Sequence, residues 1–183
     1  MNDGAGRPAL FLDRDGIVNF DSGFVSEVAD FKFLDGIFEL CKYFQSMNYR
    51  IIIITNQSGI GRGLFSLNSF HKLNVWMLNE FEKKGCKIDL VIASTLDPND
   101  KAASIREISF RKPAPGMIYA AQEIFNIDLI NSLLIGDRAT DIQAGKKAGI
   151  SNLFLVNSGH KESPESIHFS NLLDCLVRLK EIF

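Results

Sequence analysis

Four consecutive isoleucines, Ile51–Ile54, constrain the fold of this chain more than any other feature. A strand with one face in water alternates apolar and polar side chains, whereas this run is apolar on both faces. An uninterrupted β-branched run is typical of a strand in the middle of a parallel sheet, with helices packed on both sides. The sequence therefore predicts a layered α/β domain built around this strand.

Apolar runs and helix-length segments alternate along the rest of the chain. The expected strands are Ala9–Leu12, Ile51–Thr55, Leu90–Ala93, Leu133–Ile135 and Leu153–Val156. The expected helices are Gly36–Met47, Ser66–Lys84, Pro115–Phe125, Ala139–Ala148 and Ser170–Ile182. This alternation predicts a doubly wound, Rossmann-like parallel sheet of about five strands, with helices on both faces.

The length of the chain fits one domain. Its 183 residues are 46% hydrophobic and include 15 phenylalanines, which is enough to build a core without disulfides. We therefore expect a single domain over residues 1–183, with no room for a large cap domain. Residues 94–111 show weak periodicity, and loops of that length in compact domains are usually functional. We expect a long active-site loop there.

Charge and cysteine content exclude several classes of protein. A net charge of −2 without a basic stripe argues against a nucleic-acid partner. The three cysteines have no metal-binding spacing and are expected to be reduced thiols. No apolar run approaches the roughly 20 residues of a membrane span, and residues 1–8 do not resemble a signal peptide. We expect a cytoplasmic protein without a membrane partner, as a monomer or a weak homodimer.

Polar residues follow the expected strands at the point where each one ends. They are Asp13 and Asp15 after the first strand, Thr55, Asn56 and Gln57 at the second, Arg111 and Lys112 after the long loop, and Asp137 after the fourth. In doubly wound sheets, ligands bind beyond the carboxyl ends of the strands. We therefore expect these side chains to meet in one site.

The acidic residues of this set suit magnesium and phosphate chemistry. Asp13, Asp15 and Asp137 would form a cluster of hard oxygen ligands, which Mg²⁺ prefers and shares with a substrate phosphate. An aspartate can also be a covalent nucleophile that forms an aspartyl phosphate. It then needs a cation against charge repulsion and a neighbour that protonates the leaving oxygen. Asp13 as nucleophile and Asp15 as acid and base fit this division.

The remaining residues of the set suit phosphoryl binding. The Thr55 hydroxyl, with the backbone N–H groups of Asn56 and Gln57, is placed to hold phosphoryl oxygens. Lys112 supplies a point charge for the transferred group. The fork of Arg111 suits a second phosphate or a hydroxyl.

Each of these motifs has a simpler interpretation on its own. Two aspartates around one residue occur in solvated loops, and an acidic residue near a helix start is favoured by the helix dipole. The threonine and amides are typical of a capped turn, and the basic pair is typical of solvated charge. Their order at successive strand ends is what favours a shared site.

Four stretches of the chain together resemble a known superfamily. They are "FLDRDGIVN", "ITNQSGIGRG", "FRKPAPGM" and "IGDRATDIQAGKKAG", and they spread from residue 10 to residue 150. They resemble the four motifs of the haloacid dehalogenase (HAD) superfamily of phosphatases. The first and third are similar to the subgroup that contains heptose-bisphosphate and histidinol-phosphate phosphatases.

The resemblance implies a role for each matching residue. Asp13 would be the nucleophile and a Mg²⁺ ligand, and Asp15 the general acid and base that binds Mg²⁺ through its backbone carbonyl. Asp137 would be the third protein ligand. Thr55 and Lys112 would orient the phosphoryl group. Near the substrate would lie Asn56, Arg62, Arg111 and Arg138, while Asp141 would support the site or cap a helix.

One stretch departs from the subgroup. Many members carry a zinc site of cysteines and histidines in the loop before the third motif, and "STLDPNDKAASIREISFRKP" contains neither residue type. We therefore predict no structural zinc. The loop would have to be held by packing and hydrogen bonds, or be mobile. The resemblance implies that this loop borders the pocket.

The resemblance implies a Mg²⁺-dependent phosphomonoester hydrolase with an aspartyl-phosphate intermediate. The expected substrate is a small phosphorylated sugar, D-glycero-D-manno-heptose 1,7-bisphosphate, cleaved at C7 in the synthesis of lipopolysaccharide precursors. The alternatives are a histidinol-phosphate phosphatase, and a polynucleotide 3′-phosphatase, which shares the second motif but conflicts with the acidic charge. A catalytically dead binding domain is a further alternative, although every acidic and basic motif position is present. Arg14, between the two aspartates, has no role in this chemistry.

Overall fold

Six parallel strands form one sheet in the computed structural model, which describes residues 6–156 and 166–183. The strands are β1 (Ala9–Leu12), β2 (Arg50–Asn56), β3 (Leu90–Ser94), β4 (Leu133–Gly136), β5 (Asn152–Val156) and β6 (Ile167–Phe169). Their order across the sheet is β3-β2-β1-β4-β5-β6, and all neighbours pair in parallel. The five predicted strands are confirmed, and β6 is an additional strand at the edge.

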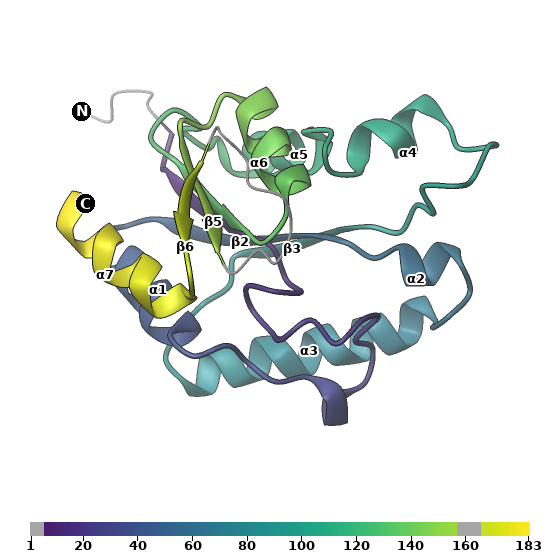
Figure 1. Ribbon diagram of the computed structural model, residues 1–183, viewed down its shortest axis with the longest axis horizontal. Coiled ribbons are helices and arrows are strands. Elements are labelled where there is room, and N and C mark those ends of the chain that lie inside the picture. The colour runs from purple at the N-terminus through teal and green to yellow at the C-terminus, as the bar shows by residue number, and fades with distance from the viewer. Residues whose placement is uncertain (1–5, 157–165) are drawn as a thin grey trace.

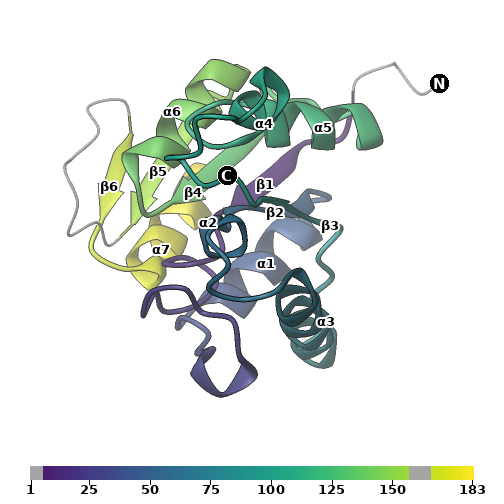
Figure 2. The same ribbon diagram turned by 90° about the vertical axis from the view of Figure 1, so that its right-hand side faces the viewer.

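Helices cover both faces of this sheet, as predicted (Figure 1). They are α1 (Ile37–Ser46), α2 (Ser58–Gly61), α3 (Leu67–Lys83), α4 (Ile105–Phe110), α5 (Gly116–Phe125), α6 (Ala139–Ala148) and α7 (Leu172–Ile182), with a short 3₁₀ turn, η1 (Val28–Asp30). Helices α1, α3 and α7 lie on one face, and α5 and α6 on the other (Figures 1 and 2). The predicted doubly wound fold is therefore the observed one.

The isoleucine run explains why both faces need helices. Ile51 and Ile53 belong to the core under α1, α3 and α7, whereas Ile52 and Ile54 belong to the core under α5 and α6. None of the four is more than 1% exposed. Successive side chains of a strand point to opposite faces, so one run of apolar residues joins two cores.

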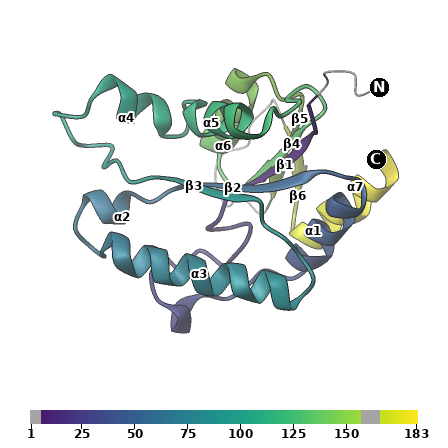
Figure 3. The same cartoon turned by 180° about the vertical axis from the view of Figure 1, so that it is seen from behind.

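The predicted loop at 94–111 is partly helical. Helix α4 occupies its second half, and its first turn is closed by a capping box. The Ser104 side chain accepts a hydrogen bond from the Glu107 N–H, and the Glu107 carboxylate accepts one from the Ser104 N–H at 2.9 Å. Helices α2 and α4 both lie at the same end of the molecule, opposite α7 (Figures 1 and 3). Neither of these short helices was predicted from the sequence.

The strand order brings three chemically important strand ends together. Strand β1 lies between β2 and β4, so the chain segments that follow these strands are neighbours. The Asp13 N–H extends the pairing beyond β1 by donating to the Ile135 carbonyl at 3.1 Å. No helix among residues 6–156 and 166–183 is long and apolar enough to cross a membrane.

Candidate active site

A cleft of about 610 Å³ opens beyond the carboxyl ends of these central strands. All predicted site residues except Asp137 line it, namely Asp13, Asp15, Thr55, Asn56, Gln57, Arg62, Arg111, Lys112 and Arg138. Asp137 lies buried beside Asp13, so the structure brings the whole predicted set to one place. The cleft also includes Asp21, Phe24 and Asp141, of which the first two had no predicted role.

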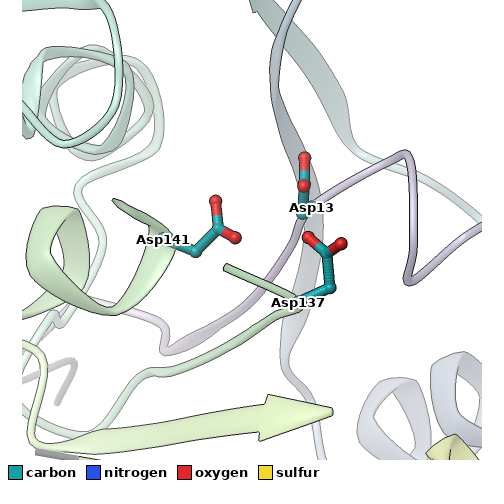
Figure 4. Close-up of side chains that lie close together, drawn as sticks. All are labelled: Asp13, Asp137 and Asp141. Atoms are coloured by element: carbon teal, nitrogen blue, oxygen red, sulfur yellow. The ribbon is translucent and has the colours of Figure 1, made fainter. Parts of the chain in front are cut away.

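Three buried carboxylates form the floor of the site (Figure 4). Asp13 follows β1, Asp137 follows β4, and Asp141 comes from the first turn of α6. One oxygen from each lies within 4.8 Å of the others, close enough to share one metal ion. The Asp15 side chain is not part of this cluster.

Two glycines permit this close approach. Gly16 has a φ of +97°, and a Cβ at that position would lie 2.4 Å from Asp137 Oδ2. At Gly136, a Cβ would lie 2.3 Å from the Cβ of Asp141. Any side chain at either position would displace a carboxylate, since contacts below 3.0 Å are not tolerated.

Crowding and burial disfavour the charged forms of Asp13 and Asp137. Burial raises the pKa of Asp13 well above its usual range, Lys112 opposes that rise, and Asp141 and Asp137 add to it. Burial and the Asp141 charge likewise raise the pKa of Asp137 to about 6, against the opposing charges of Arg138 and Lys112. Asp137 Oδ1 is buried without a hydrogen-bond partner among the described residues. An unpaired oxygen in an all-carboxylate cluster fits a hard divalent cation such as Mg²⁺.

Lys112 holds two of the carboxylates in place. Its Nζ donates to Asp13 Oδ1 at 2.8 Å and to the Ile54 carbonyl at 2.9 Å, and lies 2.6 Å from Asp141 Oδ1. Burial alone would lower the pKa of Lys112, but the charges of Asp13 and Asp141 outweigh burial and raise it above its usual range. The ammonium is therefore charged and fixed beside Asp13.

Asp141 combines the two supporting roles that the sequence left open for it. Its Oδ2 accepts from the Arg138 backbone N–H at 3.0 Å, which caps the start of α6. Its Oδ1 is the one that pairs with Lys112. This carboxylate therefore joins the helix start to the lysine.

The polar residues at the end of β2 are mostly engaged with the protein itself. Both ends of the Asn56 amide bond to the Lys112 backbone, at 3.0 and 3.1 Å. The Gln57 side chain donates to Thr55 Oγ1 at 2.9 Å, and this leaves the threonine hydroxyl hydrogen available to the cleft. The expectation that the Gln57 backbone N–H holds a phosphoryl oxygen is wrong, because that N–H donates to the Ser94 carbonyl at 2.7 Å.

Three arginines form a basic rim. Arg62 pairs with Asp97 at 3.2 Å, and Arg138 pairs with Asp21 at 2.8 Å. Burial lowers the pKa of Arg111, and the neighbouring charge of Arg62 lowers it further. Cations that crowd one another in this way favour the binding of an anion between them.

Hydrogen bonds hold the loop that lacks cysteine and histidine. The Gly61 N–H of α2 donates to the Thr95 carbonyl at 3.1 Å, and Arg111 Nη1 donates to the Leu96 carbonyl at 3.0 Å. The Arg62–Asp97 ion pair lies alongside. Of the two alternatives from the sequence, these contacts favour a loop fixed by hydrogen bonds.

Comparisons with known proteins agree with this geometry. A family described as HAD-hydrolase-like matches residues 109–173. The D-glycero-α-D-manno-heptose-1,7-bisphosphate 7-phosphatase of Campylobacter jejuni is 44% identical over 173 residues, which are 94% of this chain and 96% of that protein. The chain belongs to the heptose-bisphosphate phosphatase family of HAD hydrolases.

Other members of the heptose-bisphosphate phosphatase family extend the match. The enzyme of the same name from Burkholderia mallei is 48% identical over 149 residues, 81% of this chain and 79% of that protein. A crystal structure of D,D-heptose 1,7-bisphosphate phosphatase from B. bronchiseptica, complexed with magnesium and phosphate, superposes with a TM-score of 0.83 at 25% identity. The match covers 96% of this chain and 99% of that one. The resemblance seen in the sequence motifs is therefore confirmed over nearly the whole chain.

Proposed function

We propose that this protein is a Mg²⁺-dependent phosphatase that removes the 7-phosphate of D-glycero-α-D-manno-heptose 1,7-bisphosphate through an aspartyl phosphate. The observation that carries the proposal is the buried Asp13 carboxylate, fixed by Lys112 at 2.8 Å on the floor of a cleft with a basic rim. The names of the relatives support the substrate, and both relatives described above are named for the α anomer.

Asp13 is assigned the role of nucleophile. Its Oδ1 accepts from Lys112 Nζ and from the Arg14 backbone N–H at 2.7 Å, so the second oxygen is the one assigned to attack phosphorus. The new bond joins that oxygen to phosphorus, and the bond from phosphorus to the C7 oxygen breaks. Asp15 gives the leaving oxygen its proton.

The second half of the reaction restores the enzyme. Water attacks the phosphorus of the aspartyl phosphate, and Asp15 takes the proton that the water loses. The bond between Asp13 and phosphorus breaks, inorganic phosphate leaves, and Asp13 is again a carboxylate. Asp15 therefore acts first as an acid and then as a base.

We assign Mg²⁺ to Asp13, Asp137 and the backbone carbonyl of Asp15. When bound, the ion offsets the repulsion between the phosphate and the carboxylates and stabilises the charge of the transferred group. The unpaired Oδ1 of Asp137 supports this assignment. Asp141 is assigned to Lys112 and to the start of α6, because both of its oxygens already have those partners.

The two phosphates of the substrate then have separate sites. Thr55 and Lys112 face the phosphoryl group that is transferred, and Arg62, Arg111 and Arg138 form the rim for the phosphate that stays. A substrate with one phosphate, such as histidinol phosphate, would leave the basic rim without its anion.

Phosphate release from a defined panel tests the proposal. The panel contains both anomers of the heptose bisphosphate, histidinol phosphate and a DNA oligonucleotide with a 3′-phosphate, each with Mg²⁺ and with EDTA. We expect the highest kcat/KM on the α-bisphosphate, no release in EDTA, and a product that keeps its phosphate at C1 by ³¹P NMR. Faster turnover of histidinol phosphate or of the oligonucleotide would overturn the substrate assignment.

A further inference from the structure

Arg14 is a charged side chain that the chemistry above does not use. It is 0% exposed, and its guanidinium lies beneath the cleft with its carbon 5.6 Å from the centre of the Phe70 ring of α3. Asp13 and Asp15 on either side of it both line the cleft. The two aspartate side chains therefore face the cleft, whereas the arginine side chain between them is buried.

The Arg14 guanidinium donates hydrogen bonds to the Asp15 carboxylate from its Nε and Nη2 atoms. Arg14 Nε donates to Asp15 Oδ1 at 3.2 Å, and Nη2 contacts Oδ1 and Oδ2 at 2.9 Å each. Two neutral amides complete the cradle, with Asn19 Nδ2 on Oδ1 at 3.0 Å and Gln57 Nε2 on Oδ2 at 2.8 Å. The plane of the carboxylate is therefore fixed, and its exposed fraction of 20% faces the cleft.

Arg14 Nη2 also connects the segment after β1 to the segment at residues 20–25, which lines part of the cleft. Arg14 Nη2 also donates to the Val25 carbonyl at 2.8 Å. Val25 follows a segment that supplies Asp21 and Phe24 to the lining of the cleft. One side chain thus connects Asp15 to the segment at residues 20–25.

A gain in the stability of the folded protein does not explain why Arg14 is buried beside Asp15. A buried ion pair often contributes no more than an apolar pair of the same size. Here Nη1 of Arg14 is buried without a hydrogen-bond partner among the described residues, which adds a cost. A group that is expensive to bury and that holds a reacting carboxylate points to a role in the reaction.

We propose that Arg14 is a positioning residue that holds the Asp15 carboxylate where it can protonate the leaving oxygen of an alkyl phosphate. This inference rests on the proposed function. Oδ1 has three nitrogen donors and Oδ2 has two, so the transferred proton is assigned to Oδ2, while the donors on Oδ1 keep the carboxylate in place.

The role makes a prediction that depends on the leaving group. A sugar alkoxide needs a proton as it leaves, whereas p-nitrophenolate is a stable anion and leaves without one. The value of kcat/KM reports the steps up to and including the first irreversible one, which is the departure of the leaving group. Loss of Arg14 should therefore slow the sugar phosphate far more than p-nitrophenyl phosphate.

The experiment compares Arg14→Lys and Arg14→Met with the wild type on both substrates. With the heptose bisphosphate, we expect kcat/KM to fall by about 10²-fold for Arg14→Met, mostly through kcat, and by less for Arg14→Lys, which keeps the charge but loses the fork. With p-nitrophenyl phosphate, we expect a change of no more than about 5-fold, since general acid catalysis contributes little there. Asp15→Asn should show the same contrast between substrates.

A matched control separates positioning from damage to the fold. Arg50 begins β2 and pairs with Asp89 at 3.1 Å, at the opposite end of this strand from the cleft, so Arg50→Met also removes an ion pair. It should lower the unfolding midpoint without altering the ratio of the two kcat/KM values. Arg14→Lys serves if Arg14→Met does not fold.

The outcomes distinguish the two proposals. Equal losses on both substrates, or no loss on the bisphosphate, would overturn the role of Arg14. A wild-type protein that hydrolyses p-nitrophenyl phosphate but not the bisphosphate would overturn the proposed substrate. The same comparison would then be made with the alkyl phosphate that the protein does hydrolyse.

Discussion

Lys112 Nζ lies 2.8 Å from Asp13 Oδ1, although 99 positions separate the two residues in the chain. The contact forms only when the segment after α4 folds back against the end of β1. The ammonium also donates a hydrogen bond to a second acceptor, the Ile54 carbonyl of β2. The proposed nucleophile and the ammonium beside it are therefore brought together only in the folded sheet.

Replacing this lysine should affect both stability and activity. Lys112→Met leaves Asp13 and Asp141 buried without their cation, which should lower the free energy of unfolding by about 3–5 kcal/mol. Urea unfolding in EDTA measures the loss, and kcat/KM should fall by at least about 10²-fold. Adding Asp141→Asn should restore part of the stability but not the activity. Unchanged unfolding in the single variant would contradict the ion-pair assignment.

Asp13→Asn should abolish turnover while the protein stays folded. An amide cannot form the acyl phosphate, so we expect kcat to fall by about 10³-fold or more. Phosphate release and circular dichroism measured on the same sample test this. Residual activity within about 10-fold of the wild type would mean that another residue attacks the phosphate.

Without metal, stability should fall as pH rises through the range in which Asp137 titrates. Its folded pKa of about 6 lies above the usual 3.8, so between these values the folded state holds a proton that the unfolded state has lost. The free energy of unfolding therefore decreases with rising pH, by about 3 kcal/mol once the pH exceeds 6. Denaturation in EDTA at pH 4 and pH 7 measures this change.

The variant Asp137→Asn isolates that contribution from the other titrating groups. We expect it to gain stability relative to the wild type between pH 4 and pH 7 by the same amount. A constant difference between the two proteins over this range would show that Asp137 ionises normally.

Binding of Mg²⁺ should offset the loss of folding stability that the buried carboxylates cause. An ion that binds only the folded state at 100 times its Kd raises the free energy of unfolding by about 2.7 kcal/mol. Thermal unfolding at pH 7 with and without MgCl₂ measures the gain, which Asp137→Asn should largely lose. An equal gain in the variant would place the metal elsewhere.

The capping box of α4 should matter for substrate binding more than for overall stability. Ser104→Ala removes a cap worth about 1 kcal/mol and should raise KM for the bisphosphate about 5-fold, because Arg111 directly follows α4. Ser109→Ala, which removes a hydroxyl of the same helix outside the cap, is the control. If both variants bind the bisphosphate like the wild type, the order of α4 does not position Arg111.

The sequence predicted the sheet well where burial decides the structure. All ten expected strands and helices are present, with bounds within two residues of the prediction. Strand β6 was missed because Ile167 and His168 are exposed, so it lacks the apolar run that identifies a core strand. Helix α4 was missed because a capping box defines it and none of its residues is buried. The spacing of Ser104 and Glu107 in the sequence is nevertheless typical of a capping box at a helix start.

The candidate site was predictable to the extent that each residue follows a strand. Strand ends placed Asp13, Thr55 and Asp137 correctly, because parallel strands end at one edge of the sheet. Hydrogen bonds that depend on how distant segments pack could not be predicted from the sequence. Examples are the Gln57 N–H that donates to Ser94 and the buried grip of Arg14 on Asp15, which depend on the packing of distant segments.

The position of β1 between β2 and β4 has a consequence for how such a protein changes during evolution. Asp13 and Asp137 directly follow the central strands β1 and β4, and the Lys112 ammonium is bonded to the Ile54 carbonyl of β2. All three of these side chains are buried. The rim arginines come from segments at the surface. Mutations in those segments can therefore exchange one phosphorylated substrate for another while the core that performs the hydrolysis is inherited unchanged.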